Sequence, residues 1–144
     1  VDGKPYVLEY NVRMGDPETE VVIPRLQTDL VELFIATRDQ QLADKSLELD
    51  PRTCTTVMLV SGGYPEAYEK GKVMTGWVEK ADSIYFHAGT KAEDDQIKTN
   101  GGRVLAISSF GESISEAVNR SLELADQVEF DGKYFRRDIG QDLM

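Results

Sequence analysis

"RVLAISSFGESISEAVNRSLELADQV", residues 103–128, contains two kinds of apolar spacing. The apolar run at 103–109 is typical of a strand. Ser113 and Glu116 then have the spacing of a capping box, in which side chains bind the first backbone N–H groups of a helix. A helical stripe runs on to about residue 128 and consists of Ile114, Ala117, Val118, Ser121, Leu122, Ala125 and Val128. The stretch predicts a strand followed by one long amphipathic helix.

Short apolar runs elsewhere supply further strands. We expect strands at about 54–60 and 83–87, because both runs lie between turn-forming residues. The segment KAEDDQIKTNGG, residues 91–102, is rich in acidic and glycine residues that favour tight turns, so it predicts a hairpin. The expected fold class is therefore α+β, with a small antiparallel sheet and a covering helix.

The segment SLELDPRT, residues 46–53, interrupts these patterns and marks a change in sequence texture. We place a domain boundary there, which divides the chain into residues 1–46 and 47–144. In the first part, PYVLEYNV at 5–12 predicts a strand. A helix at about 26–42 is predicted from the helical spacing of Leu26, Leu30, Leu33, Phe34 and Leu42.

Polar side chains alternate along the strand expected at 5–12. Glu9, Asn11 and Arg13 would share one face, because successive residues of a strand point to opposite sides. A carboxylate and an amide oxygen so placed suit Mg²⁺ that is otherwise held by phosphates and water. Arg13 suits a carboxylate or phosphate group. A strand with a solvated polar face explains the same pattern, and spacing alone leaves both interpretations open.

The next residues, Gly15, Asp16 and Pro17, predict a turn that enters a short helix. Asp16 suits the cap and Pro17 the first helical position, and Pro24 is expected to interrupt this helix. Free N–H groups between Gly15 and Thr19 would form an anion site. Acidic side chains in the turn are equally able to occupy that site.

Composition excludes several classes of protein. The formal net charge of −10 over 144 residues opposes binding to nucleic acid, whose affinity depends on basic groups. No apolar run is long enough to span a membrane. Cys54, the single cysteine, cannot form an intrachain disulfide, and no charged and apolar leader follows Val1. We therefore expect a cytoplasmic protein.

Five segments in order resemble the phosphoribosylamine–glycine ligase family, also called glycinamide ribonucleotide synthetase, of the ATP-grasp superfamily. They cover roughly residues 4–140 and read EYNVRMGDPETE, SGGYPEAYEKGKVMTG, FHAGTK, TNGGRVL and YFRRDIG. The resemblance implies a carbon–nitrogen ligase of purine biosynthesis. Such a ligase joins glycine to 5-phosphoribosylamine with ATP, through glycyl phosphate.

The resemblance also implies roles for single residues. Glu9 and Asn11 match the family's magnesium-binding pair, for Mg²⁺ or Mn²⁺, and Arg13 with the Gly15-Asp16-Pro17 turn becomes a candidate for binding substrate. Family members are several times longer than this chain. Residues 1–46 would thus be the last edge of an ATP-grasp domain and 47–144 the C-terminal domain. The upstream domains of the enzyme would be partners, and the chain alone would be inactive.

The rival hypothesis is a non-catalytic binding or interaction module. SGGYPEAYEKGK, residues 61–72, lacks the Ser or Thr that a phosphate loop needs after its lysine, so we expect a turn and a short helix there. Lys70 and Lys72 are left without a role. Structural roles are expected for His87, Trp77, Tyr134 and Phe135.

Overall fold

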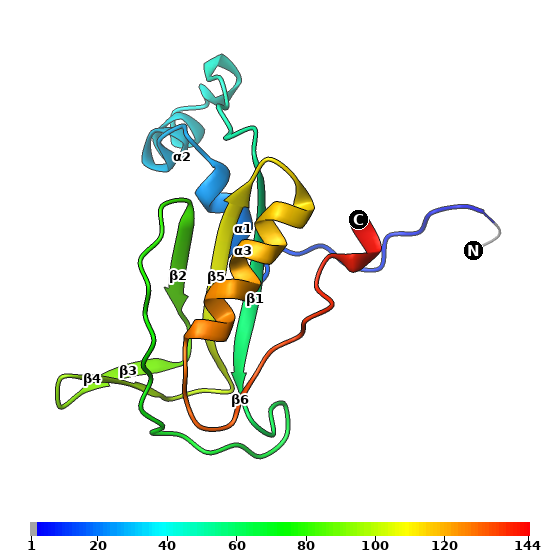
Figure 1. Ribbon diagram of the computed structural model, residues 1–144. Coiled ribbons are helices and arrows are strands. Elements are labelled where there is room, and N and C mark those ends of the chain that lie inside the picture. The colour runs from blue at the N-terminus through cyan, green and yellow to red at the C-terminus, as the bar shows by residue number, and fades with distance from the viewer. Residues whose placement is uncertain (1–2) are drawn as a thin grey trace.

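The computed structural model describes residues 3–144 and contains a four-stranded antiparallel sheet (Figure 1). The strands follow the order β2-β5-β1-β6. Their bounds are Thr53–Ser61 for β1, Ser83–His87 for β2, Arg103–Gly111 for β5 and Lys133–Tyr134 for β6. The three strands predicted from apolar runs are confirmed to within two residues. They form the centre of the fold because β5 pairs with β1 on one side and β2 on the other.

Helix α3, Ile114–Gln127, covers one face of the sheet. The Ser113 hydroxyl accepts the Glu116 N–H at 3.2 Å, and the Glu116 carboxylate accepts the Glu112 N–H at 2.8 Å. The predicted cap and covering helix are therefore confirmed. The apolar stripe was predicted to include Leu122 and not Leu124. In the structure Leu124 is fully buried, whereas Leu122 is only partly buried.

The predicted hairpin is also present, as β3 (Thr90–Glu93) and β4 (Gln96–Thr99). Asp94 and Asp95 connect the strands with φ of 51° and 57°. Two positive φ values in a two-residue loop match the twist of paired strands, and short acidic residues tolerate them well. The hairpin projects away from the main sheet (Figure 1).

Helix α1, Thr19–Arg25, lies on the other face of the sheet. The Ser108 hydroxyl of β5 donates to the Glu20 carbonyl oxygen at 2.7 Å. The Arg25 guanidinium donates to the Asp50 carbonyl at 3.1 Å, and the Asp50 N–H donates to the Arg25 carbonyl at 2.7 Å. Residues before the expected boundary thus pack on residues after it. The domain division at residue 46 stays a prediction.

The N-terminal strand prediction is wrong for this chain, since residues 5–12 form neither helix nor strand. They extend away from the sheet, with Leu8 and Val12 each 97% exposed (Figure 1). A strand requires a neighbour to bind its backbone groups, and the described residues provide none. The alternation of Glu9 and Asn11 therefore has no sheet face to define it.

The two predicted helices begin later than expected. α1 begins at Thr19 with Glu18 in the cap position, not with Asp16 and Pro17, and Pro24 lies in its last turn. α2 covers Leu30–Arg38 only, because Asp29 caps its first N–H groups. Short 3₁₀ turns occur at Leu42–Asp44 and Gln141–Leu143. Over residues 3–144, no helix has the length and apolar character needed to cross a membrane.

A truncation tests whether residues 47–144 fold alone. The core cluster consists entirely of residues after 56, so a 47–144 variant should melt cooperatively. Its melting temperature should fall by roughly 5–15 °C, because the hydrogen bonds to α1 are lost. A 15–144 variant, which keeps α1 and lacks only the extended segment, is the control and should melt within about 2 °C of the whole chain. A non-cooperative melt of 47–144 would contradict the boundary.

Candidate functional site

Segments far apart in the sequence meet at one end of the sheet. The Ser61 N–H donates to the Gly102 carbonyl and the Ser61 hydroxyl to the Gly101 carbonyl, both at 2.8 Å. The Asn100 N–H donates to the Gly89 carbonyl at 2.7 Å. The segments FHAGTK, TNGGRVL and SGGYPEAY therefore pack against one another. β6 brings the segment YFRRDIG to the same place, because it pairs with the end of β1.

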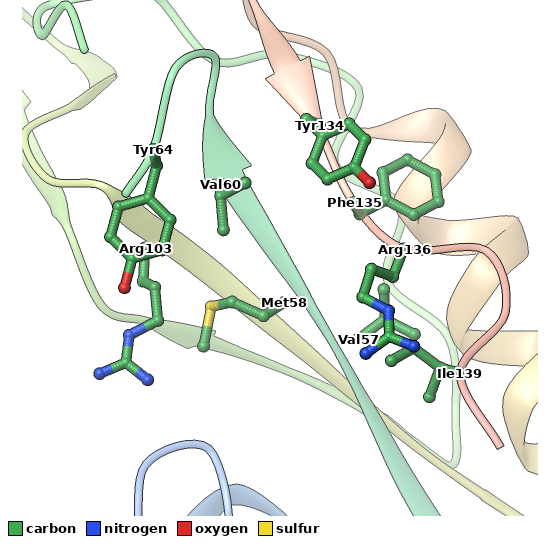
Figure 2. A pocket seen from close by; sticks show the side chains of 9 residues that line it. All are labelled: Val57, Met58, Val60, Tyr64, Arg103, Tyr134, Phe135, Arg136 and Ile139. Carbon is green, nitrogen blue, oxygen red and sulfur yellow. The ribbon is translucent and has the colours of Figure 1, made fainter. Parts of the chain in front are cut away.

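A pocket of about 350 Å³ is lined by residues of three of these segments, which contribute Tyr64, Arg103 and Arg136 (Figure 2). Met58 and Val60 of β1 form its apolar floor, and Arg103 and Arg136 lie on opposite sides of Met58. Arg136 is paired with Asp138 through two contacts of 3.0 and 2.9 Å. The other lining residues are Val57, Tyr64, Tyr134, Phe135 and Ile139. The pocket combines apolar and aromatic surface with two guanidinium groups, each of which already contacts a carboxylate of the chain.

The turn predicted to bind substrate docks on Arg103. Arg103 Nη1 donates to the Asp16 carbonyl oxygen at 2.7 Å, and Nη2 lies 3.3 Å from the Asp16 carboxylate. Inside the turn, the Gly15 N–H donates to the Glu18 carboxylate at 2.6 Å, and the Gly15 carbonyl accepts the Thr19 N–H at 3.0 Å. The peptide bond between Asp16 and Pro17 is cis. The Glu18 carboxylate therefore binds one of the free N–H groups of the turn. This agrees with the alternative prediction that acidic side chains of the turn fill the anion site.

The predicted metal pair lies on the extended segment that precedes this turn. Glu9 and Asn11 are exposed on the extended segment, and neither has a hydrogen bond or ion pair within residues 3–144. Arg13 is also exposed and donates to the neighbouring Met14 carbonyl at 2.9 Å. In that same range, no group of three or more His, Cys, Asp or Glu side chains is arranged to hold a metal. Two exposed side chains with oxygen atoms are thus present on this segment, and such a pair could hold Mg²⁺ only with phosphates and water completing its coordination.

Lys72 and His87 have local partners. Lys72 lies 2.7 Å from Glu69 and 2.9 Å from Asp131, and these carboxylates raise its pKa. His87 Nδ1 lies 2.8 Å from the Thr90 hydroxyl. Lys70 and Lys72 both lie in residues 62–72. This segment forms turns and no helix, so the short helix expected there is absent.

Sequence reasoning missed Arg103, Arg136 and Tyr64 as site residues. Each lies in one of the five segments that carried the resemblance, and that was the available signal. Tyr134 and Phe135 were expected to be structural; both line the pocket, and Phe135 also belongs to the core. Contacts between segments determine which residues line the pocket, and the spacing of residues within one segment does not predict such contacts.

Comparisons with known proteins agree on one family. The family described as "Phosphoribosylglycinamide synthetase, C domain" matches residues 54–142. The chain is 48% identical over 141 residues to the phosphoribosylamine–glycine ligase of Vibrio parahaemolyticus, a match that covers 96% of this chain and 33% of the relative. The corresponding protein of Chlorobaculum tepidum is 43% identical over 141 residues.

A solved structure is similar as well. The crystal structure of the phosphoribosylamine–glycine ligase of Thermotoga maritima matches with a TM-score of 0.75 and 42% identity, over 95% of this chain and 34% of that chain. The chain therefore spans about a third of the length of the relatives that it matches.

Substitution of Gly102 tests the packing of the pocket wall. A Cβ at Gly102 would lie 2.1 Å from Cδ2 of Tyr64, so the ring must move in Gly102→Ala. We expect the free energy of unfolding to fall by about 1–3 kcal/mol, measured by denaturant titration. In a Tyr64→Ala background the same substitution should cost less than half as much, because the nearer ring is gone and only Cε1 of Tyr68, 3.0 Å from the added Cβ, still crowds it. An equal cost in both backgrounds would contradict this packing.

Proposed function

The chain belongs to the phosphoribosylglycinamide synthetase family, and we propose that it acts as part of a phosphoribosylamine–glycine ligase. That ligase would join glycine to 5-phosphoribosylamine with ATP and release glycinamide ribonucleotide, ADP and phosphate. Because the chain spans about a third of its relatives, we propose that it works together with the remaining domains of such an enzyme. We infer a cytoplasmic location from the nature of these substrates and the single cysteine.

One observation carries the proposal: three of the five segments of the resemblance line one pocket, and a fourth contacts its lining residue Arg103. The turn at Asp16 docks on Arg103, which lines that pocket with Tyr64 and Arg136. Chain segments that are separated in sequence and brought to one concave surface are the usual construction of a binding site. A non-catalytic module would not require the Asp16 turn to lie beside this pocket.

We further propose that Glu9 and Asn11 hold Mg²⁺ or Mn²⁺ at the ATP site of the assembled enzyme. Their exposed oxygens are free of partners within residues 3–144, which supports this use. A divalent ion there would neutralise charge on the phosphate groups of ATP during transfer. The role of the two side chains is to bind and orient that ion.

Arg13 and the turn would contact the substrates. Arg13 is exposed and its guanidinium has one local hydrogen bond, so further N–H groups remain available for a carboxylate or phosphate. The exposed Asp16 carboxylate would accept a hydrogen bond from an amine. Gly15 and Pro17 fix the backbone that presents it. We propose these four residues as a binding surface for glycine or 5-phosphoribosylamine.

The isolated chain should be inactive. Within residues 3–144, the proposed metal ligands lie on an extended segment that no other element covers, so no enclosed nucleotide site is formed. Purified chain incubated with ATP, glycine and 5-phosphoribosylamine should give no glycinamide ribonucleotide. A chimera in which this chain replaces the matching third of the Vibrio parahaemolyticus ligase should give product. A folded but inactive chimera would contradict the proposed function.

Substitution of the metal pair in this chimera tests the ligand assignment. Glu9→Gln removes one charge while keeping side-chain size, and turnover should fall by about two powers of ten or more. Asn11→Ala should act in the same direction, and added magnesium should partly restore both variants. Glu123→Gln, on the exposed side of α3, is the matched control and should leave turnover unchanged. Full turnover of Glu9→Gln at low magnesium would refute the assignment.

A further inference from the structure

A β-bulge in β5 determines which way Arg103 points. β1 and β5 pair regularly up to Leu59, which lies opposite Leu105, but the next residue, Val60, lies opposite Arg103. Val104 is therefore the extra residue of a bulge. Unbroken alternation would place Arg103 on the face of Leu105, which belongs to the core. The bulge moves Arg103 to the opposite face, and redirecting a side chain is a known use of bulges beside functional sites.

The bulge is also hydrogen-bonded to the segment on the β2 side of β5. The Val104 carbonyl accepts the N–H groups of Ala88 and Gly89, both at 3.1 Å, and the Val104 side chain is fully buried. These contacts come from the residues that follow β2. The extra residue is therefore part of the packed sheet, and the direction of Arg103 is built into the fold.

Arg103 and Ser108 together fix one segment of the chain. Arg103 binds the carbonyl oxygen of Asp16 at 2.7 Å, and Ser108 binds that of Glu20 at 2.7 Å. Both donors belong to β5, and their acceptors lie at the two ends of residues 16–20. The Arg103 guanidinium also lies 3.3 Å from the Asp16 carboxylate. A single strand thus sets the position of the turn and of the start of α1.

We propose that Arg103 is a positioning residue, directed by the bulge at Val104, that holds the Asp16–Pro17 turn in its place beside the pocket. Its effect on catalysis rests on the proposed function, in which this turn binds substrate. Its effect on the turn itself is a property of the chain and can be measured without activity.

Hydrogen exchange on the whole chain measures the turn directly. The amides of Thr19 and Val22, which bond to Gly15 and Glu18, should exchange about tenfold faster in Arg103→Met, because a charged donor to the turn is lost. Arg103→Lys should show a smaller increase in exchange rate, because an ammonium group can keep one of the two contacts that the guanidinium makes with Asp16. Arg137→Met removes a guanidinium paired with Asp126 and should leave both amides unchanged.

Two further variants guard against general unfolding. Asp16→Asn weakens the charged contact without altering the sheet, so it should raise the same exchange rates, and Arg103→Met should add less in that background than in the wild type. Unchanged exchange at Thr19 and Val22 in Arg103→Met, or an equal increase throughout β1 and β5, would overturn the proposal.

Kinetics of the chimera test the catalytic consequence. Arg103→Met should raise KM for glycine or 5-phosphoribosylamine about tenfold, with KM for ATP changed less than about twofold, and Arg103→Lys should restore part of the loss. A fall in kcat alone, with every KM unchanged, would overturn the positioning role. An inactive wild-type chimera would contradict the proposed function only, because the exchange result on the chain would still decide the role of Arg103.

Discussion

β5 is buried along its length from Val104 to Gly111, and this constraint organises the rest of the molecule. A strand buried on both faces must carry a layer on each side, and here α3 supplies one and α1 the other. Its buried hydroxyl groups need partners as well. Ser108 finds the Glu20 carbonyl of α1, and Ser109 lies 2.9 Å from the hydroxyl of Ser83 on β2. The polar residues of the strand therefore join the layers as much as its apolar residues do.

Elements decided by local chemistry could be predicted from the sequence. α3 follows from its Ser113 cap and apolar stripe, and the β3–β4 hairpin from acidic residues able to adopt positive φ. Elements that depend on distant partners could not be predicted in the same way. Residues 5–12 have the composition of a strand, but composition does not supply a neighbouring strand. α2 is shorter than its apolar spacing suggested, because Asp29 caps it late and Gln40 takes a φ of 58° just beyond its end.

The residues of the candidate site also separate into those set by local sequence and those set by contacts between distant segments. The turn at Asp16 was recognisable because its residues are adjacent in sequence. Arg103 was not, because its direction depends on strand pairing: without the bulge, Arg103 would face the core under α3. Tyr64 reaches the pocket because its ring packs where Gly102 has no side chain. Such relations between separate segments are invisible to spacing within one segment.

The layer formed by α1 also hides the only sulfhydryl group of the chain. Cys54 lies opposite Phe110 in the ladder, on the face of β1 that α1 covers, and is 8% exposed. Burial raises the pKa of its thiol, which further lowers the fraction present as the reactive thiolate. Alkylation of the native chain must therefore await an opening of the structure around it. The rate at which Cys54 is alkylated, followed by mass spectrometry, therefore reports how often that opening occurs, without any engineered label.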